Sequence, residues 1–190
     1  MYNFMPVLAA LSRVVLVFSV TFFVPWAWSW WGDEHRLQEV WLLSFAVTFT
    51  CGALVMWRTQ SHRRELMPKD GFMLVNLVWA VLPAFAALPL WLGVPSMDWT
   101  DAYFEAVSGL TATGATVLSG LDTLPLAINV WRCFLQLFGG LGIMLLVVAI
   151  LPLLGLGGVQ LYKAETPGPM KDAKLTPRIA ETARGLWGVY

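Results

Sequence analysis

Long apolar runs separated by short polar connections dominate the chain. Four runs reach the roughly 20 residues that a helix needs to cross about 30 Å of hydrocarbon, and they cover residues 7–30, 37–57, 71–93 and 126–153. Tryptophans cluster near the ends of these runs, as interfacial anchors of membrane proteins do. The pattern predicts an all-α polytopic membrane protein whose main partner is the lipid bilayer.

Composition narrows the functional classes. Of 190 residues, 58% are hydrophobic and 13% are charged, with twelve Lys and Arg against twelve Asp and Glu. This balance gives no basic excess of the kind that nucleic-acid binding uses. There is no nucleophile and base pair and no cofactor motif, so we expect neither an enzyme nor a bound cofactor. Cys51 and Cys133 lie inside apolar runs, which suggests buried packing residues.

Basic residues gather in two connections. Residues 58–70 contain Arg58, Arg63, Arg64 and Lys69, and residues 155–184 contain Lys163, Lys171, Lys174, Arg178 and Arg184. Residues 94–130 contain no Lys or Arg. Cytoplasmic loops carry the excess of Lys and Arg. The sequence therefore predicts a multi-pass membrane protein with a cytoplasmic N-terminus and residues 94–130 outside.

This orientation constrains the segment between the third and fourth runs. If both basic connections are cytoplasmic, the two runs are antiparallel, and the segment between them leaves and returns on one side. WTDAYFEAVSGL fits a short helix with Thr100 as its N-cap and Asp101 in its first turn. TATGATVLSG must then return as non-helical backbone, which is tolerated at membrane depth only where protein buries it or where it lines a polar cavity.

A short helix followed by a Thr/Gly strand can direct backbone carbonyls at an ion that has lost its water, as potassium filters do. Converging carbonyls demand backbone angles that glycine accepts cheaply, which gives Gly114 a reason. An ordinary small extracellular loop is the alternative for such a string. Its place between two antiparallel runs, with acidic residues and no cationic ones around it, favours the filter.

Several motifs also carry a family resemblance. They are DAYFEAVSGLTATGATVLSGLDTLP, WRCFLQLFGGLGIMLLVVAILPLLG, YKAETPGP and KLTPRIAETARGLWGVY, in this order. Together they resemble the membrane subunits of Trk-type potassium uptake systems (TrkH), a branch of the Trk/Ktr/HKT superfamily. The resemblance implies four non-identical helix-pore-helix repeats around one K⁺ pathway, often preceded by two extra helices.

Mapped onto this chain, the resemblance implies three regions. Residues 1–70 form the two leading helices and a cytoplasmic loop, 71–153 the first repeat, and 154–190 a cytoplasmic linker and the start of a truncated second repeat. Thr176 and Pro177 are a good N-cap and first residue for that last helix. The implied filter residues, which offer backbone carbonyls, are Thr111, Ala112, Thr113, Gly114 and Ala115. Among them, K⁺ is expected at Ala112, Thr113 and Gly114, although the second glycine and the tyrosine of the TVGYG filter are missing.

Charged residues surround the expected filter. The acids expected at its outer mouth, where they would concentrate cations, are Asp98, Asp101, Glu105 and Asp122. Arg132 lies about 9 Å into the last helix at the usual rise. It either snorkels to the interface or pairs with Glu105 or Asp101 and braces the pore helix, and both interpretations stay open.

The resulting hypothesis is potassium uptake across the inner membrane, with this chain contributing one of four filter strands. The implied partners are K⁺, the remaining repeats, a cytosolic nucleotide-binding regulatory subunit and a second copy in a homodimer. Two alternatives are a non-conducting scaffold or assembly subunit and a fragment of an unrelated secondary transporter. A scaffold would tolerate Gly114→Ala, whereas a transporter that works by alternating access would have broken helices and a solute site at the midplane.

Overall fold

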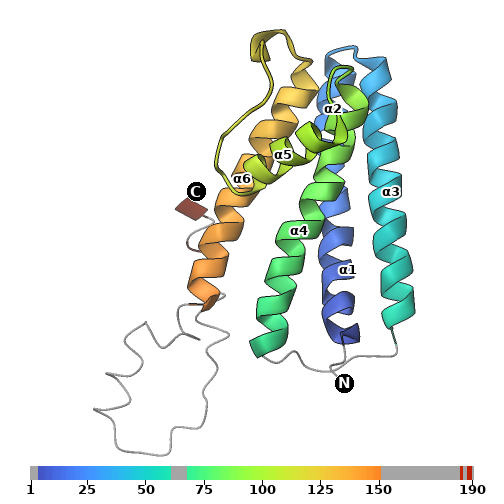
Figure 1. Ribbon diagram of the computed structural model, residues 1–190. Helices are drawn as coiled ribbons and strands as arrows, with labels where there is room; N and C mark the ends of the chain where they lie inside the picture. Colours follow the sequence, from blue (N-terminus) through green and yellow to red (C-terminus); the bar gives the residue numbers. More distant parts are fainter. Residues whose placement is uncertain (1–3, 61–67, 151–184, 186–187, 190) are drawn as a thin grey trace, which may run out of the picture. The chain divides into compact units, whose positions relative to one another are not determined.

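The computed structural model describes residues 4–60 and 68–150, together with 185, 188 and 189. The regular elements within these ranges are helices (Figure 1), which confirms the all-α class. By its contacts the chain splits into two compact units, Met1–Leu137 and Phe138–Tyr190. The expected filter segment lies wholly in the first unit. The predicted linker and the helix start at Thr176 and Pro177 lie outside the described residues.

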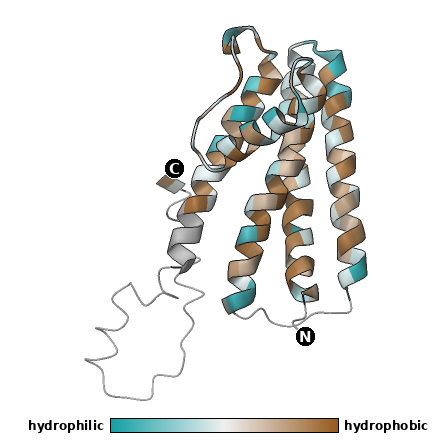
Figure 2. Cartoon of the chain, in the orientation of Figure 1, coloured by the Kyte–Doolittle hydropathy of each residue, from teal (hydrophilic) through white to brown (hydrophobic). Residues whose placement is uncertain are grey.

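Four helical stretches are long and apolar enough to cross a membrane. They are Met5–Trp31, His35–Thr59, Lys69–Gly93 and Leu126–Ile143, which confirms the four predicted spans as helices. Hydrophobic residues run along their lengths, while hydrophilic residues gather near several of their ends (Figure 2). Together they make a multi-pass membrane protein.

The first span is not one uniform helix. It consists of α1 (Met5–Ser19), a single 3-10 turn η1 (Val20–Phe22) and α2 (Phe23–Trp31). Pro25 explains the tighter turn, because its nitrogen cannot donate to the carbonyl of Thr21 and its ring crowds that carbonyl. The Thr21 hydroxyl instead donates to the carbonyl of Phe18, at 2.6 Å.

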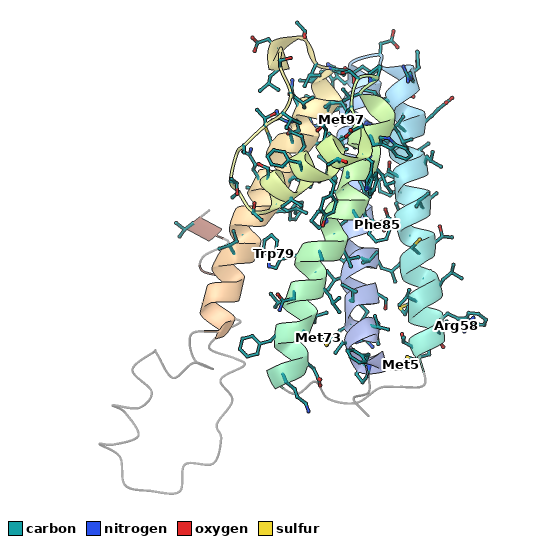
Figure 3. All side chains as sticks on the ribbon, viewed as in Figure 1. Met5, Arg58, Met73, Trp79, Phe85 and Met97 are labelled. Atoms are coloured by element: carbon teal, nitrogen blue, oxygen red, sulfur yellow. The ribbon has the colours of Figure 1, made fainter. Side chains whose placement is uncertain are left out.

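The remaining long helices are α3 (His35–Thr59), α4 (Pro68–Gly93) and α6 (Leu126–Ile150). In the first unit α1 packs against α3 and α4, and α4 packs against α5 (Trp99–Leu110). Arg58, near the end of α3, lies at the opposite end of the bundle from Met97, which precedes α5 (Figure 3). The end of α3 and the start of α5 are therefore at opposite ends of this bundle.

The core of the first unit centres on Trp131 of α6, which is fully buried. Its ring centroid lies 4.9 Å from that of Phe22, 5.6 Å from that of Trp41 and 6.0 Å from that of Phe18. Its Nε1 donates to the carbonyl of Ala86 in α4, at 3.0 Å. A single side chain thus joins α6 to the two leading spans and to α4, and such aromatic contacts add to the burial of their area.

The expected burial of the two cysteines is wrong, because Cys51 and Cys133 are both exposed in the described structure. The position of a residue in an apolar run indicates that it lies within the membrane and not in water. It does not distinguish the face of a helix that packs on protein from the face that meets lipid.

Candidate ion-pathway segment

The segment between α4 and α6 leaves and returns at one end of the bundle. Helix α5 slopes inward from that end, residues 111–120 climb back without regular structure, and the short turn η2 (Leu121–Thr123) leads into α6 (Figure 1). This is the path that the sequence predicts for a pore helix and a return strand.

The start of α5 differs from the expected one. The N-cap is Asp98, whose Oδ1 accepts a hydrogen bond from the backbone nitrogen of Asp101 at 2.8 Å. Thr100 therefore lies inside the first turn and is not the cap. Both residue types cap well, and the structure gives the extended backbone of an N-cap to Asp98, with φ at −83° and ψ at 174°. Asp101 is in the first turn as expected, where the helix dipole favours a negative charge.

The end of α5 is a Schellman motif that turns the chain sharply outward. The nitrogen of Thr113 donates to the carbonyl of Ser108, and the nitrogen of Ala112 donates to that of Gly109, both at 2.9 Å. Ala112 carries the left-handed conformation of this motif, with φ at +53°. Glycine usually occupies this place, since a Cβ there costs about 1–2 kcal/mol.

Gly114 has a second left-handed conformation, with φ at +74°. A Cβ added at this position would meet no heavy atom of the first unit within 4 Å. Within this chain, the requirement for glycine therefore comes from the backbone angle and not from a close approach. Two left-handed residues in three positions give the strand a conformation that an ordinary β-strand does not have.

Glu105 fastens the return strand to its helix. Its Oε1 accepts hydrogen bonds from the backbone nitrogen of Val117, at 2.7 Å, and from the hydroxyl of Thr116. Its Oε2 accepts from Nε of Arg132 in α6, at 3.1 Å. One carboxylate thus joins α5, the strand and α6.

This placement separates Glu105 from the other three expected mouth acids. Its side chain is only 2% exposed, so it belongs to the interior, whereas Asp98 and Asp122 are exposed and Asp101 is partly exposed. Helical spacing explains the difference, because Glu105 shares the buried face of α5 with Ala102, Ala106 and Gly109. Of the two partners considered for Arg132, the structure has Glu105.

Ser108 adds a second link between helix and strand. Its hydroxyl donates to the carbonyl of Ala115 at 2.6 Å, so this carbonyl is directed at α5. One lone pair of this oxygen is thus used within the chain, and the use of Ala115 as an ion ligand stays a prediction. The sequence analysis does not single out Ser108 or Thr116. The pattern that could have indicated Ser108 is its spacing of three residues from Glu105, which puts two polar side chains on an otherwise apolar helix face.

The middle of the strand is more open. Ala112, Thr113 and Gly114 are exposed, and among the described residues none donates a hydrogen bond to their carbonyl oxygens. The Thr111 hydroxyl donates to the carbonyl of Val107 at 2.8 Å and lies 2.7 Å from the hydroxyl of Thr113. The three central carbonyls are therefore available to a ligand.

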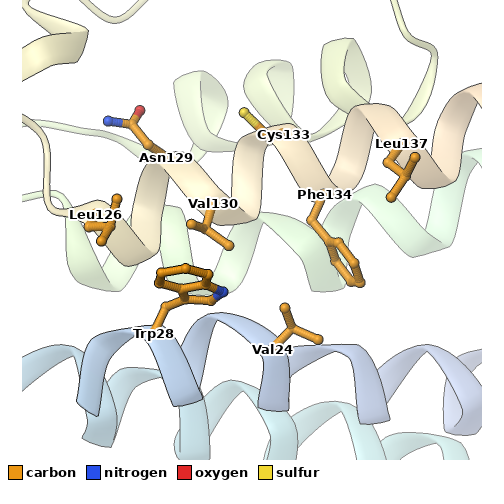
Figure 4. A pocket seen from close by; sticks show the side chains of 8 residues that line it. All are labelled: Val24, Trp28, Leu126, Asn129, Val130, Cys133, Phe134 and Leu137. Atoms are coloured by element: carbon orange, nitrogen blue, oxygen red, sulfur yellow. The ribbon is translucent and has the colours of Figure 1, made fainter. Parts of the chain in front are cut away.

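An apolar groove of about 450 Å³ lies elsewhere, between α2 and α6 (Figure 4). Its lining residues are Val24, Trp28, Leu126, Asn129, Val130, Cys133, Phe134 and Leu137. Replacing the hydration shell of an ion takes several oxygen atoms around it, and this lining offers one side-chain amide. The groove does not have the chemistry of an ion site.

Known proteins are similar to this chain in sequence and in fold. The family model "TrkH: Cation transport protein" matches residues 37–190. The Trk system potassium uptake protein TrkH of Vibrio parahaemolyticus is 54% identical over 148 residues, which cover 77% of this chain and 30% of that protein. The TrkH protein of Halomonas elongata is 46% identical over 185 residues, which cover 97% and 38%.

A solved structure agrees with these relationships. The crystal structure of the potassium transporter TrkH from Vibrio parahaemolyticus has a TM-score of 0.79 and 40% sequence identity, and the match covers 100% of this chain and 37% of that one. The chain thus spans between 30% and 38% of the length of the two curated relatives.

Proposed function

Because the chain belongs to the TrkH family of cation transport proteins, we propose that it supplies one filter strand to a K⁺ uptake pathway. The relatives are named as potassium uptake proteins. The observation that carries the proposal is the return strand, whose carbonyls at Ala112, Thr113 and Gly114 accept no hydrogen bond from a described residue. We place the pathway in the bacterial inner membrane, with the N-terminus in the cytoplasm.

The chemistry is the replacement of water by fixed carbonyl oxygens. The C-terminal end of α5, which carries the negative end of the helix dipole, is directed into the bundle and favours a cation there. Glu105 and Ser108 hold the outer part of the strand on α5, so the central carbonyls have a fixed support. The exposed acids Asp98 and Asp122, with Asp101, raise the local cation concentration at the outer end.

One strand surrounds only part of an ion, so the complete site needs strands from the remaining repeats. A cytosolic nucleotide-binding regulatory subunit and a homodimeric assembly remain expectations that come from the family. A non-conducting scaffold and a secondary transporter with a midplane solute site are the competing functions.

The test is Gly114→Ser in the complete transporter. A side chain at φ +74° forces the strand to a different angle and turns at least one carbonyl away. We expect K⁺ preference over Na⁺, measured by ion competition in uptake, to fall while expression stays near normal.

Gly71→Ser is the matched control, because a Cβ there meets no heavy atom within 4 Å and its φ is not left-handed. Wild-type preference in well-expressed Gly114→Ser protein would contradict the filter role and favour the scaffold.

A further inference from the structure

The turn between α2 and α3 reaches the start of α6. Glu34 directly precedes α3, and its Oε1 accepts a hydrogen bond from the backbone nitrogen of Leu126 at 2.9 Å. Leu126 is the first residue of α6. The first amides of a helix have no partner within the helix, and a negative charge there is favoured by the dipole. Glu34 therefore caps α6 from 92 positions away.

The second carboxylate oxygen of Glu34 makes an unfavourable contribution to the free energy of this arrangement. Oε2 is buried and has no hydrogen-bond partner among the described residues. Leaving a buried polar atom unpaired is unfavourable by about 1–3 kcal/mol. The carboxylate is thus kept in a poorly solvated place, where its hydrogen bond within the described structure goes to α6.

The helix that Glu34 caps also carries Arg132, the ion-pair partner of Glu105. Six positions after Leu126, Arg132 donates to Glu105, and Glu105 holds the strand at Thr116 and Val117. Between them, Trp131 fills the space beside Phe22 and Trp41. The cap sets where α6 begins, and the packed indole opposes rotation about its axis.

We propose that Glu34 is a positioning residue for ion selection, with the leading helices acting on the filter through α6. By fixing the first turn of α6, Glu34 holds the Arg132 guanidinium at the height where it meets Glu105, and so holds the outer part of the strand. The inference rests on the filter role proposed for residues 112–114.

Ion preference is the readout, because a role in folding alone would lower the amount of protein without changing its selectivity. In the complete transporter, Glu34→Ala is expected to lower K⁺ preference over Na⁺ on the order of threefold, as couplings of this kind do. Glu34→Gln keeps an oxygen that can accept from Leu126 and is expected to restore most of the preference. Glu39→Ala, at an exposed position of α3, is the control and should leave it unchanged.

A second pair of variants tests the same hydrogen bond from its donor. Leu126→Pro removes the N–H at the first helical position, where proline fits the helix, and leaves Glu34 intact. It should reproduce the loss seen in Glu34→Ala, whereas Leu126→Ala, which keeps the N–H, should not.

Wild-type preference in both Glu34→Ala and Leu126→Pro, at normal expression, would overturn the inference. If one of them fails to express, the other decides. Gly114→Ser separates the two proposals. If only Gly114→Ser changes the K⁺ preference over Na⁺, the filter role is supported and the role of Glu34 is contradicted. If Gly114→Ser leaves this preference unchanged, the filter role itself is contradicted.

Discussion

Gly109 shows how closely a single residue controls the distance between α5 and α6. A Cβ at this position would lie 2.9 Å from Cβ of Leu135, which is fully buried. Cβ cannot move by rotation of its own side chain, so the two backbones would have to separate. The absence of a side chain at Gly109 is therefore a condition for the close packing of α5 on α6.

We predict that Gly109→Ala destabilises the transporter by about 1–3 kcal/mol, the usual range for an overpacked core. Thermal unfolding in detergent measures the effect. Gly71→Ala is the control, because its Cβ meets nothing within 4 Å. Equal melting temperatures for the two variants would show that α5 and α6 can separate at no cost.

At the scale of elements, one ion pair with little access to solvent links α5 and the strand to α6. The side chains of Arg132 and Glu105 are 15% and 2% exposed. Removing one partner of such a pair leaves an uncompensated charge, which costs about 3–5 kcal/mol, whereas replacing both is often tolerated.

We therefore predict that Arg132→Met lowers stability strongly, and that Glu105→Gln with Arg132→Met recovers much of the loss. Chemical denaturation of the purified transporter gives both values. Asp122→Asn is the control at an exposed position of η2 and should change stability little. A double variant as unstable as Arg132→Met would assign the loss to the hydrogen bonds of Glu105 with the strand.

Element positions were the most predictable part of the fold. Apolar length predicts the four spans, and the polar segment between antiparallel runs predicts a helix with a return strand. The details that depend on direction were not predictable. Which carbonyl of the strand faces α5 is decided by the turn that brings Ala115 back to Ser108. Which face of α6 is buried is decided by its contacts with helices distant in sequence, such as that of Trp131 with Ala86. The burial of Glu105 is readable from helix periodicity, because Ala102, Ala106 and Gly109 share its face of α5.

For the whole molecule, the placement of the connections follows from the bundle. Arg58 and the start of α5 lie at opposite ends, and the Lys and Arg rule assigns the Arg58 end to the cytoplasm. We predict that single cysteines at Asp33 or Ser96 react with an impermeant thiol reagent from outside intact cells. Cysteines at Ser61 or Asp172 should react only after the cells are opened.

Cys51 and Cys133, both exposed in the described structure, are first replaced by serine, so that the introduced cysteine is the thiol that the reagent reports. Labelling at Ser61 from outside would reverse the orientation, and the strand would then open toward the cytoplasm.

The ion pair between Glu105 and Arg132 also has a consequence for biosynthesis. Glu105 is made 27 residues before its partner, which at ordinary translation rates is a delay of roughly 1–5 seconds. A lone charged side chain at membrane depth costs about 3 kcal/mol or more. Helix α5 is therefore expected to wait at the membrane surface until α6 emerges, and the nascent chain places its return strand only after the spans on both sides are present.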